Sequence, residues 1–133
     1  MANTTFTGPV RSQNGFQSIT IDGTTGAVTV DAIFGTAVVG AVQSLSGAGA
    51  VNITTLLTSL TTTGSNQALT LADGAAGQLK VITHTVDGGS AILTPTTKIG
   101  FSTITFTAVG DTATLVYTAA GWAIIGSRGV TIA

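Results

Sequence analysis

Residues 102–127 read STITFTAVGDTATLVYTAAGWAIIGS, and this stretch decides the fold class of the chain. Threonines alternate with large apolar residues, and Asp111 is the only charged residue of the stretch. A period of two residues is typical of β-strands, because successive side chains of a strand point to opposite faces of the sheet. The alternation breaks at Gly110-Asp111, where a two-residue turn with glycine first suits a tight hairpin. The pattern therefore predicts a β-hairpin over residues 102–118 and a further turn near Gly121.

The turn at Gly110-Asp111 fixes which residues of this hairpin face each other. The predicted pairs are Phe106–Leu115 and Ile104–Tyr117 on one face, and Thr105–Val116 and Thr107–Thr114 on the other. A β-branched hydroxyl side chain fits a pleated sheet, tolerates water and can also pack against another subunit. The second face, made of Thr105, Thr107, Thr114 and Val116, is therefore the candidate subunit interface. An even-length turn near Ala120 would put Trp122 on the Phe106 face, whereas a three-residue turn would move it across.

Two more hairpins follow from the same rules. In FQSITIDGTTGAVTV, residues 16–30, a four-residue loop at 23–26 pairs Ile21 with Val28. The same register pairs Ile19 with Val30 and Thr20 with Thr29. A turn at Gly88-Gly89 joins the strands QLKVITHTV and AILTP. It predicts the pairs Val86–Ala91, His84–Leu93 and Ile82–Pro95, and QALTLAD, residues 67–73, reads as one further strand.

The remaining segments carry weaker patterns. Residues 1–15 show neither a strand period nor a helical one, which predicts an extended N-terminal arm. Residues 51–64 have apolar positions at helical spacing, but their many threonines disfavour a helix, so we expect short strands there. The predicted organisation is an arm, residues 1–15, followed by a single antiparallel β domain, residues 16–133. Strands about ten residues apart are typical of a sandwich, a barrel or a prism.

The composition narrows the classes of function. Of the 133 residues, 44% are hydrophobic and 7% are charged, and the formal net charge is −1. So small a charge gives no electrostatic attraction to nucleic acid or to an anionic membrane, and neither is an expected partner. No stretch approaches the ~18 uninterrupted apolar residues of a membrane helix, and the N-terminus lacks the apolar core of a signal peptide. We expect a soluble protein made in a cytoplasm, and its low charge predicts contacts between subunits.

The titratable residues form no recognisable catalytic or metal-binding motif. His84, the only histidine, falls between Ile82 and Val86 on an apolar strand face, where a structural role is expected. A zinc site needs several His or Cys ligands, and the chain has no cysteine. We therefore predict no catalytic residue, no cofactor and no metal site.

The other polar and aromatic residues also suit structural positions. Four aspartates adjoin a glycine at a proposed turn, where an Asx hydrogen bond is expected: Asp22, Asp73, Asp87 and Asp111. We expect Lys80 and Lys98 to be solvated. The alternation of aromatic residues with threonine favours core or subunit packing over a sugar platform for Phe101, Phe106, Tyr117 and Trp122.

Two stretches resemble a β module of structural proteins from tailed bacteriophages, especially marine and cyanobacterial ones. The first, ALTLADGAAGQLKVITHTVDGGSAILTP, combines an Asp-Gly loop, Gly-Gln-x-Lys-x-Ile, Asp-Gly-Gly and Thr-Pro. The second, TITFTAVGDTATLVYTAAGWAIIGS, contains Val-Gly-Asp-x-Ala-x-Leu and Gly-Trp. Together they cover about half of the chain, from Ala68 to Ser127. The N-terminal NTTFTGPVRSQNGF also looks like the leader of small phage virion proteins.

This resemblance implies a virion protein without catalytic activity. Such proteins are usually capsid decoration (cement) proteins or fibre parts, and they are commonly trimeric. The chain is short for a fibre and has no repeated shaft, which favours decoration. The implied partners are the major capsid protein, on the outer surface of the assembled capsid, and further copies of this chain. The alternative is a head-fibre or receptor-binding module that contacts host glycans, and a carbohydrate-active enzyme is a third class.

The arm supplies the candidate capsid contacts. An extended strap can lay Phe6 and Val10 into apolar grooves between capsid subunits, while Pro9 limits the entropy that is lost on ordering. Arg11 can pair with an acidic residue of the capsid, although a surface ion pair contributes only ~1 kcal/mol or less.

Overall fold

The computed structural model describes residues 16–34 and 38–133, and all regular structure in them is β. The predicted all-β class is confirmed. Within these residues there is no helix, and hence none long and apolar enough to cross a membrane. The chain divides into two compact units, Met1–Gly40 and Ala41–Ala133. The predicted boundary after residue 15 lies at the limit of the described residues and stays a prediction.

The described part of the first unit is a three-stranded antiparallel sheet, in which β2 (Val28–Phe34) lies between β1 (Phe16–Ile21) and β3 (Val38–Gly40). The predicted register of its hairpin is confirmed, with Ile21 opposite Val28, Ile19 opposite Val30 and Thr20 opposite Thr29. Asp22 holds the turn, because its carboxylate accepts the N–H groups of Thr24 and Thr25. The hydrogen bonds from Thr25 and Thr24 keep the pKa of Asp22 below its ordinary value.

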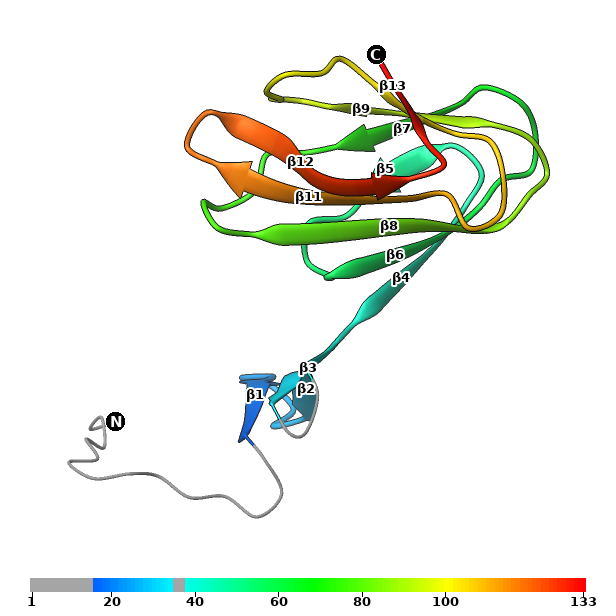
Figure 1. Cartoon of the computed structure of the whole chain (residues 1–133). Coiled ribbons are helices and arrows are strands. Elements are labelled where there is room, and N and C mark those ends of the chain that lie inside the picture. The colour runs from blue at the N-terminus through cyan, green and yellow to red at the C-terminus, as the bar shows by residue number, and fades with distance from the viewer. Residues whose placement is uncertain (1–15, 35–37) are drawn as a thin grey trace. The chain divides into compact units, whose positions relative to one another are not determined.

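The second unit consists of two five-stranded sheets that enclose one core (Figure 1). In sheet I the strand order is β12 (Gly121–Arg128), β11 (Thr112–Thr118), β8 (Leu79–Val86), β6 (Leu57–Thr61) and β4 (Val42–Ser46). In sheet II it is β13 (Thr131–Ile132), β10 (Ile104–Phe106), β9 (Ala91–Pro95), β7 (Gln67–Leu71) and β5 (Gly49–Val51). Of the three predicted architectures, this arrangement corresponds to the sandwich.

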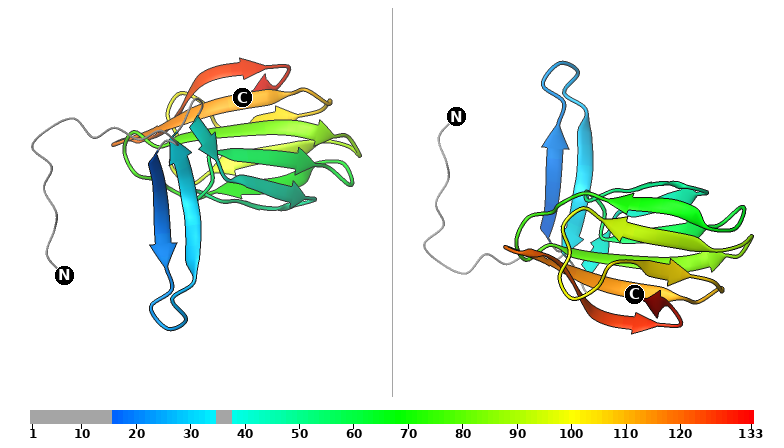
Figure 2. Two further views of the ribbon diagram at one scale, coloured as in Figure 1. Left: turned by 90° about the horizontal axis from the view of Figure 1, so that it is seen from below. Right: turned by 90° about the horizontal axis from the view of Figure 1, so that it is seen from above.

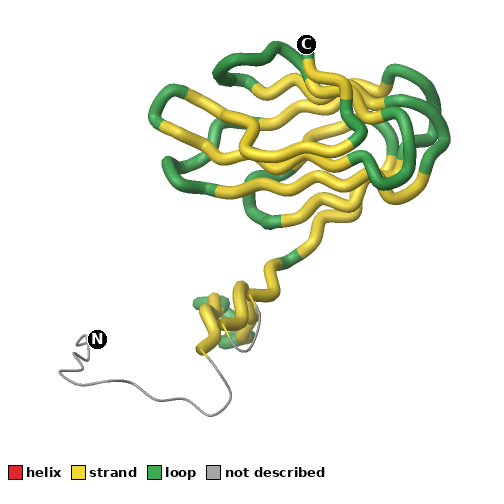
Figure 3. The backbone as a smooth tube through the Cα atoms, in the orientation of Figure 1, coloured by secondary structure: helices red, strands yellow, loops and turns green. Residues whose placement is uncertain are grey.

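From β4 to β9 the chain winds as a coil, because each strand lies in the sheet opposite to the one before it (Figures 2 and 3). We call β4–β5, β6–β7 and β8–β9 the three rungs of the coil. Consecutive rungs place β4, β6 and β8 side by side and parallel in sheet I, and β5, β7 and β9 parallel in sheet II. In the second unit, antiparallel pairing is confined to β10–β13 and the strands beside them. The prediction of a wholly antiparallel domain is therefore wrong.

Two of the predicted hairpins are wrong for the same reason. Gly110-Asp111 leads from β10 in sheet II to β11 in sheet I, so Thr105 lies opposite Ile92 and not Val116. Gly88-Gly89 leads from β8 in sheet I to β9 in sheet II, and Val86 and Ala91 lie in different sheets. The alternation of apolar and polar residues shows which side of a strand is buried, but it does not show which strand lies beside it. A crossing between two packed sheets keeps the apolar sides inward just as a hairpin does.

The last hairpin, β11–β12, is present. Tyr117 lies opposite Trp122 and Thr118 opposite Gly121, so the turn has the even length that places Trp122 on the buried side. The strands at 67–71, 79–86 and 91–95 are also confirmed, and within 51–64 the structure has the short strand β6.

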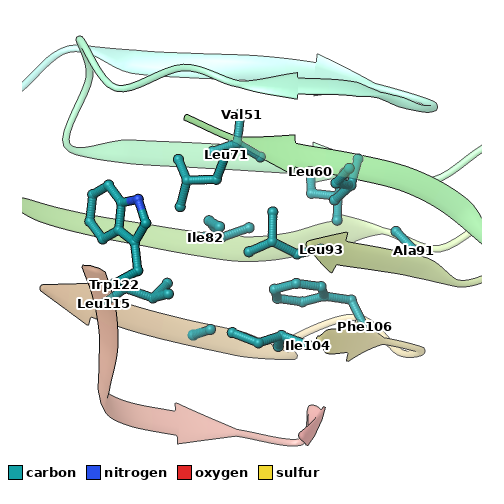
Figure 4. Packing of buried hydrophobic residues seen from close by; sticks show 12 residues of the cluster. Val51, Leu60, Leu71, Ile82, Ala91, Leu93, Ile104, Phe106, Leu115 and Trp122 are labelled. Atoms are coloured by element: carbon teal, nitrogen blue, oxygen red, sulfur yellow. The ribbon is translucent and has the colours of Figure 1, made fainter. Parts of the chain in front are cut away.

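The core lies between the two sheets (Figure 4). Its fully buried apolar residues are Val51, Leu60, Leu69, Leu71, Ile82, Ala91, Leu93, Ile104, Phe106, Ala113, Leu115 and Trp122. The indole N–H of Trp122 donates to the carbonyl of Ala72 at 2.9 Å, so this large side chain leaves no buried donor unpaired. The predicted core positions of Trp122 and Phe106 are confirmed, and Tyr117 and Phe101 pack against the same cluster.

The Asp-Gly-Gly motif serves the corner where the third rung passes over the second. A Cβ atom at Gly88 would overlap the backbone carbonyl of Thr62. A Cβ atom at Gly89 would lie 2.7 Å from the nitrogen of Ser65 and closer still to the carbonyl of Gly64, and Gly89 has φ +140°. Neighbouring corners therefore stack backbone on backbone, which only glycine permits.

Candidate interaction surface

The buried polar side chains join corners and loops of the fold. Thr62 is the clearest case, since its hydroxyl accepts the N–H of Gly88 at 2.8 Å and donates to the carbonyl of Gly89 at 2.9 Å. His84 Nε2 lies 3.0 Å from the same hydroxyl. Because the Thr62 hydroxyl donates to Gly89, its oxygen is left to accept a hydrogen bond from Nε2 of His84. His84 is buried, as its place on an apolar strand face predicted, and its Nδ1 has no partner among the described residues.

The predicted Asx hydrogen bonds are present at Asp22 and Asp87, whereas Asp111 and Asp73 bond to other residues. Asp111 Oδ2 accepts the backbone N–H groups of Thr107 at 2.7 Å and Ala108 at 3.0 Å. Burial alone would raise the pKa of Asp111, but these hydrogen bonds and the nearby His84 outweigh it, so the pKa is lowered. Asp87 accepts the N–H of Gly89, whereas Asp73 reaches across to the N–H and hydroxyl of Thr97.

Lys80 is buried, so the prediction that it is solvated is wrong. Only 1% of its surface is exposed, and its Nζ donates to the carbonyl of Thr55 at 2.9 Å and to the Thr55 hydroxyl at 3.0 Å. Thr55 lies in the corner between β5 and β6, beside the strand that carries Lys80. Burial lowers the pKa of Lys80 to about 8. Lys98 is half-buried and donates to the carbonyl of Pro95.

These contacts leave no catalytic arrangement to describe. In residues 16–34 and 38–133, no group of three or more His, Cys, Asp or Glu side chains could hold a metal ion. The candidate functional feature of the second unit is its pair of outward sheet faces.

The sequence matches no protein-family model. No curated protein is similar to it.

The outward face of sheet I carries two rows of side chains that cross its strands. One row consists of hydroxyl residues: Thr112, Thr83, Ser59 and Ser44. The adjacent row is mostly aliphatic: Thr114, Val81, Leu57 and Val42. The only charged side chain on this face is Arg128, at the end of the edge strand β12. We call this surface the sheet I face.

The outward face of sheet II is also uncharged. One row consists of Thr131, Thr105, Ile92 and Ala68. The other consists of Thr94, Thr70 and Ala50. The five strands of this sheet contain no charged residue. Charged groups of the second unit lie in loops, at an edge or inside the sandwich.

The structure separates the predicted interface residues. Thr114 and Val116 stand on the sheet I face, whereas Thr105 belongs to the outward face of sheet II. Thr107 lies in the loop after β10 and bonds to Asp111. The four residues therefore do not form one surface. The predicted capsid contacts Phe6, Pro9, Val10 and Arg11 lie outside the described residues.

The spacing of charged residues along the chain is a signal of the uncharged surface that the predicted hairpins do not use. Residues 32–72 contain no charged residue, and this run supplies β4, β5, β6 and β7. The strands at one end of each sheet therefore carry no charged side chain.

Proposed function

We propose that this protein is a non-catalytic structural component of a bacteriophage virion, which binds the outer surface of the assembled capsid and stabilises it. The observation that carries the proposal is the pair of broad sheet faces, on which Arg128 is the only charged side chain. The interior polar groups of the same unit are used in hydrogen bonds that hold its corners together. Hydroxyl and aliphatic rows suit contact with another protein surface. The identity of that surface as the major capsid protein rests on the resemblance of residues 68–127 to phage virion proteins.

The mechanism of stabilisation is mass action. A protein that binds only the assembled shell shifts the equilibrium against disassembly by RT ln(1 + [L]/Kd) at each site. Contacts made by uncharged faces depend little on ionic strength, because salt screening acts on charged groups. Binding of this kind persists when the salt concentration around the particle changes.

We also propose that the protein acts as a homo-oligomer, a trimer as the resemblance implies. The sheet I face is the better candidate for the subunit contact, since Val42, Leu57 and Val81 form an aliphatic row on it. The outward face of sheet II has only Ile92 as a large aliphatic residue. Light scattering on the purified protein is expected to give a multiple of three subunits of 13.1 kDa.

Two lysine substitutions distinguish the faces. Thr114→Lys puts a charge into the aliphatic row of the sheet I face, and we expect it to reduce the oligomer to smaller species, because burying an unpaired ammonium is costly. Thr105→Lys makes the same change on the outward face of sheet II and is the matched control. If only Thr105→Lys loses the oligomer, the subunit contact lies on the outward face of sheet II instead. Circular dichroism checks that both variants keep their β structure.

The capsid proposal is tested with phage particles that lack the protein. Purified protein is added back, and we expect a copy number close to that of capsid subunits and a higher temperature of particle disruption. Binding should change little between about 0.05 M and about 1 M NaCl. A copy number of only a few per particle, together with binding to host cells, would instead support the receptor-binding alternative. Failure to bind either partner would refute the capsid proposal.

A further inference from the structure

Within the second unit, residues 41–133, the coil of three rungs is covered by further strands at one end and not at the other. At the β8–β9 end, the antiparallel strands β11 and β10 continue sheets I and II. At the other end, β4 and β5 are the last strands of their sheets among the described residues. Stacked-rung proteins generally need a cap at each end, because an open strand edge offers unpaired N–H and C=O groups to other chains.

The other sheet edges are protected. On β12, the N–H of Trp122 donates to the carbonyl of Thr97, and the carbonyl of Trp122 accepts the N–H of Ile99. A register shift in the β11–β12 pair and the charge of Arg128 blunt the rest of that edge. In sheet II, β13 has only two residues and β5 three. Short, bulged or charged edges are the usual safeguards against pairing with another chain.

The edge of β4 has none of these safeguards. Its five residues, VQSLS, include neither proline nor charge, and it pairs with β6 without any register shift. The N–H of Gly47 donates to the carbonyl of Thr61, and Ser46 is the register partner of Thr61. Backbone groups alternate in direction along a strand, so the N–H and C=O groups of Val42, Ser44 and Ser46 point away from β6. Val42 is 52% exposed, and both serines are exposed as well.

We propose that this edge is an interface for a second copy of the same chain, in which β4 pairs antiparallel with β4 about a two-fold axis at Ser44. With the axis at Ser44, all three residues whose backbone groups point outward are paired. Ser44 lies opposite Ser44 of the partner subunit, and Val42 lies opposite Ser46 of the partner subunit. Each such pair exchanges two backbone hydrogen bonds. Moving the axis by one residue leaves one hydrogen-bonded residue pair fewer, so the register centred on Ser44 is favoured.

A second copy fits this edge better than another occupant does. No charged residue lies between Asp31 and Asp73, so two copies meet at this end without like-charge repulsion. The remaining edges of the unit are too short or too protected to serve as partner for β4. Antiparallel pairing also sends the two Gly40–Ala41 connections to opposite ends of the joined strands. Sheet I then continues from one copy into the next.

This edge contact is separate from the sheet I face of the proposed function. It uses the backbone of β4, whereas Thr114 lies on β11, the third strand along from β4 in the same sheet. The two-fold contact is therefore expected to persist in Thr114→Lys, with a mass near two subunits of 13.1 kDa. Failure of the capsid or face proposal would leave this result unchanged, so the proposals fail independently.

Single cysteines test the register, since the natural chain has no cysteine. At the two-fold axis the Cα atoms of a hydrogen-bonded pair are about 5.5 Å apart, which is within disulfide range. The matched control is Ser46→Cys, whose two copies would be about 14 Å apart along the strands. We expect Ser44→Cys to form the disulfide dimer at least about tenfold faster than Ser46→Cys under mild oxidation. Equal rates, or no dimer from Ser44→Cys, would overturn the proposal.

A second variant measures association without a disulfide. Ser44→Pro removes the central outward N–H, and it leaves the bonds to β6 intact because that N–H does not point to β6. We expect the dimer dissociation constant, measured by sedimentation, to rise at least about tenfold. Ser44→Ala keeps the backbone donor and is expected to associate like the natural chain. Unchanged association in Ser44→Pro, or equal weakening in both variants, contradicts strand pairing at β4.

Discussion

Gly89→Ala is expected to lower the free energy of unfolding by about 4 kcal/mol, measured by urea denaturation. Two effects add at this position. The backbone has φ +140°, which residues with a Cβ atom rarely adopt, and the new methyl group would overlap Gly64 and Ser65 in the neighbouring corner. Neither neighbour is a flexible side chain, so the stacked corners of the second and third rungs must move apart.

Gly110→Ala is the matched control for this prediction. Gly110 has φ +91°, but a Cβ atom there would meet nothing within 4 Å. The substitution therefore imposes backbone strain without a collision, and we expect a loss of about 1 kcal/mol. Equal losses at Gly89 and Gly110 would show that close packing of the corners is not what requires glycine in the Asp-Gly-Gly motif.

Stability is expected to rise with pH above neutrality because of Lys80. Its pKa in the folded protein is about 8, against 10.5 for the exposed side chain. Between these values the unfolded chain binds the proton more tightly than the folded protein does. The free energy of unfolding should therefore increase from about pH 7.5 to about pH 10.5, by up to about 3 kcal/mol. Below pH 7 both states hold the proton, and the contribution of Lys80 is constant.

Two methionine substitutions check this assignment by urea denaturation at several pH values. Lys80→Met keeps much of the buried aliphatic chain but cannot titrate, and we expect the rise in stability between pH 7.5 and 10.5 to disappear. Lys98→Met is the control and should keep the rise. If the two variants behave alike, the pH dependence has another origin.

The sequence was sufficient for the fold class and for most strands. Strict alternation in TITFT and TATLVYT predicted strands, and the loop DGTTGA fixed the register of β1 with β2. The side of the sheet that Trp122 takes stayed open in the sequence, and the structure has the even-length turn at Ala119-Ala120. These inferences rely on contacts close in sequence, where turn chemistry limits the choices.

The pairing of distant strands could not be predicted in the same way. Leu57 lies opposite Val81, and Gln67 lies opposite Ala91. A hairpin and a crossing between sheets bury the same alternate residues, so the apolar pattern cannot separate them. The distinguishing signal was at the corners, where two adjacent glycines meet neighbouring backbone instead of forming a tight turn.

The uncharged character of the surface was predicted, but the residues that make up each face were not. Low charge indicated interaction faces, and Arg128 is the only charged side chain on the outward sides of the two sheets. Thr105 and Thr114 were assigned to one face because a hairpin was assumed between them. Lys80 was misplaced because a lysine flanked by Leu79 and Val81 reads as exposed, whereas the free carbonyl of Thr55 in the next corner provides a buried partner.

The winding of β4 to β9 has a consequence for how such a chain can change in length over evolution. In each sheet, a middle rung touches only the rung before it and the rung after it. Insertion of one more turn of about twenty residues, with glycines at its corner, would meet the same kind of neighbour on both sides. The antiparallel strands β10 to β13 would close the longer protein unchanged. Duplication of one short segment would thus yield a longer molecule with the same two ends.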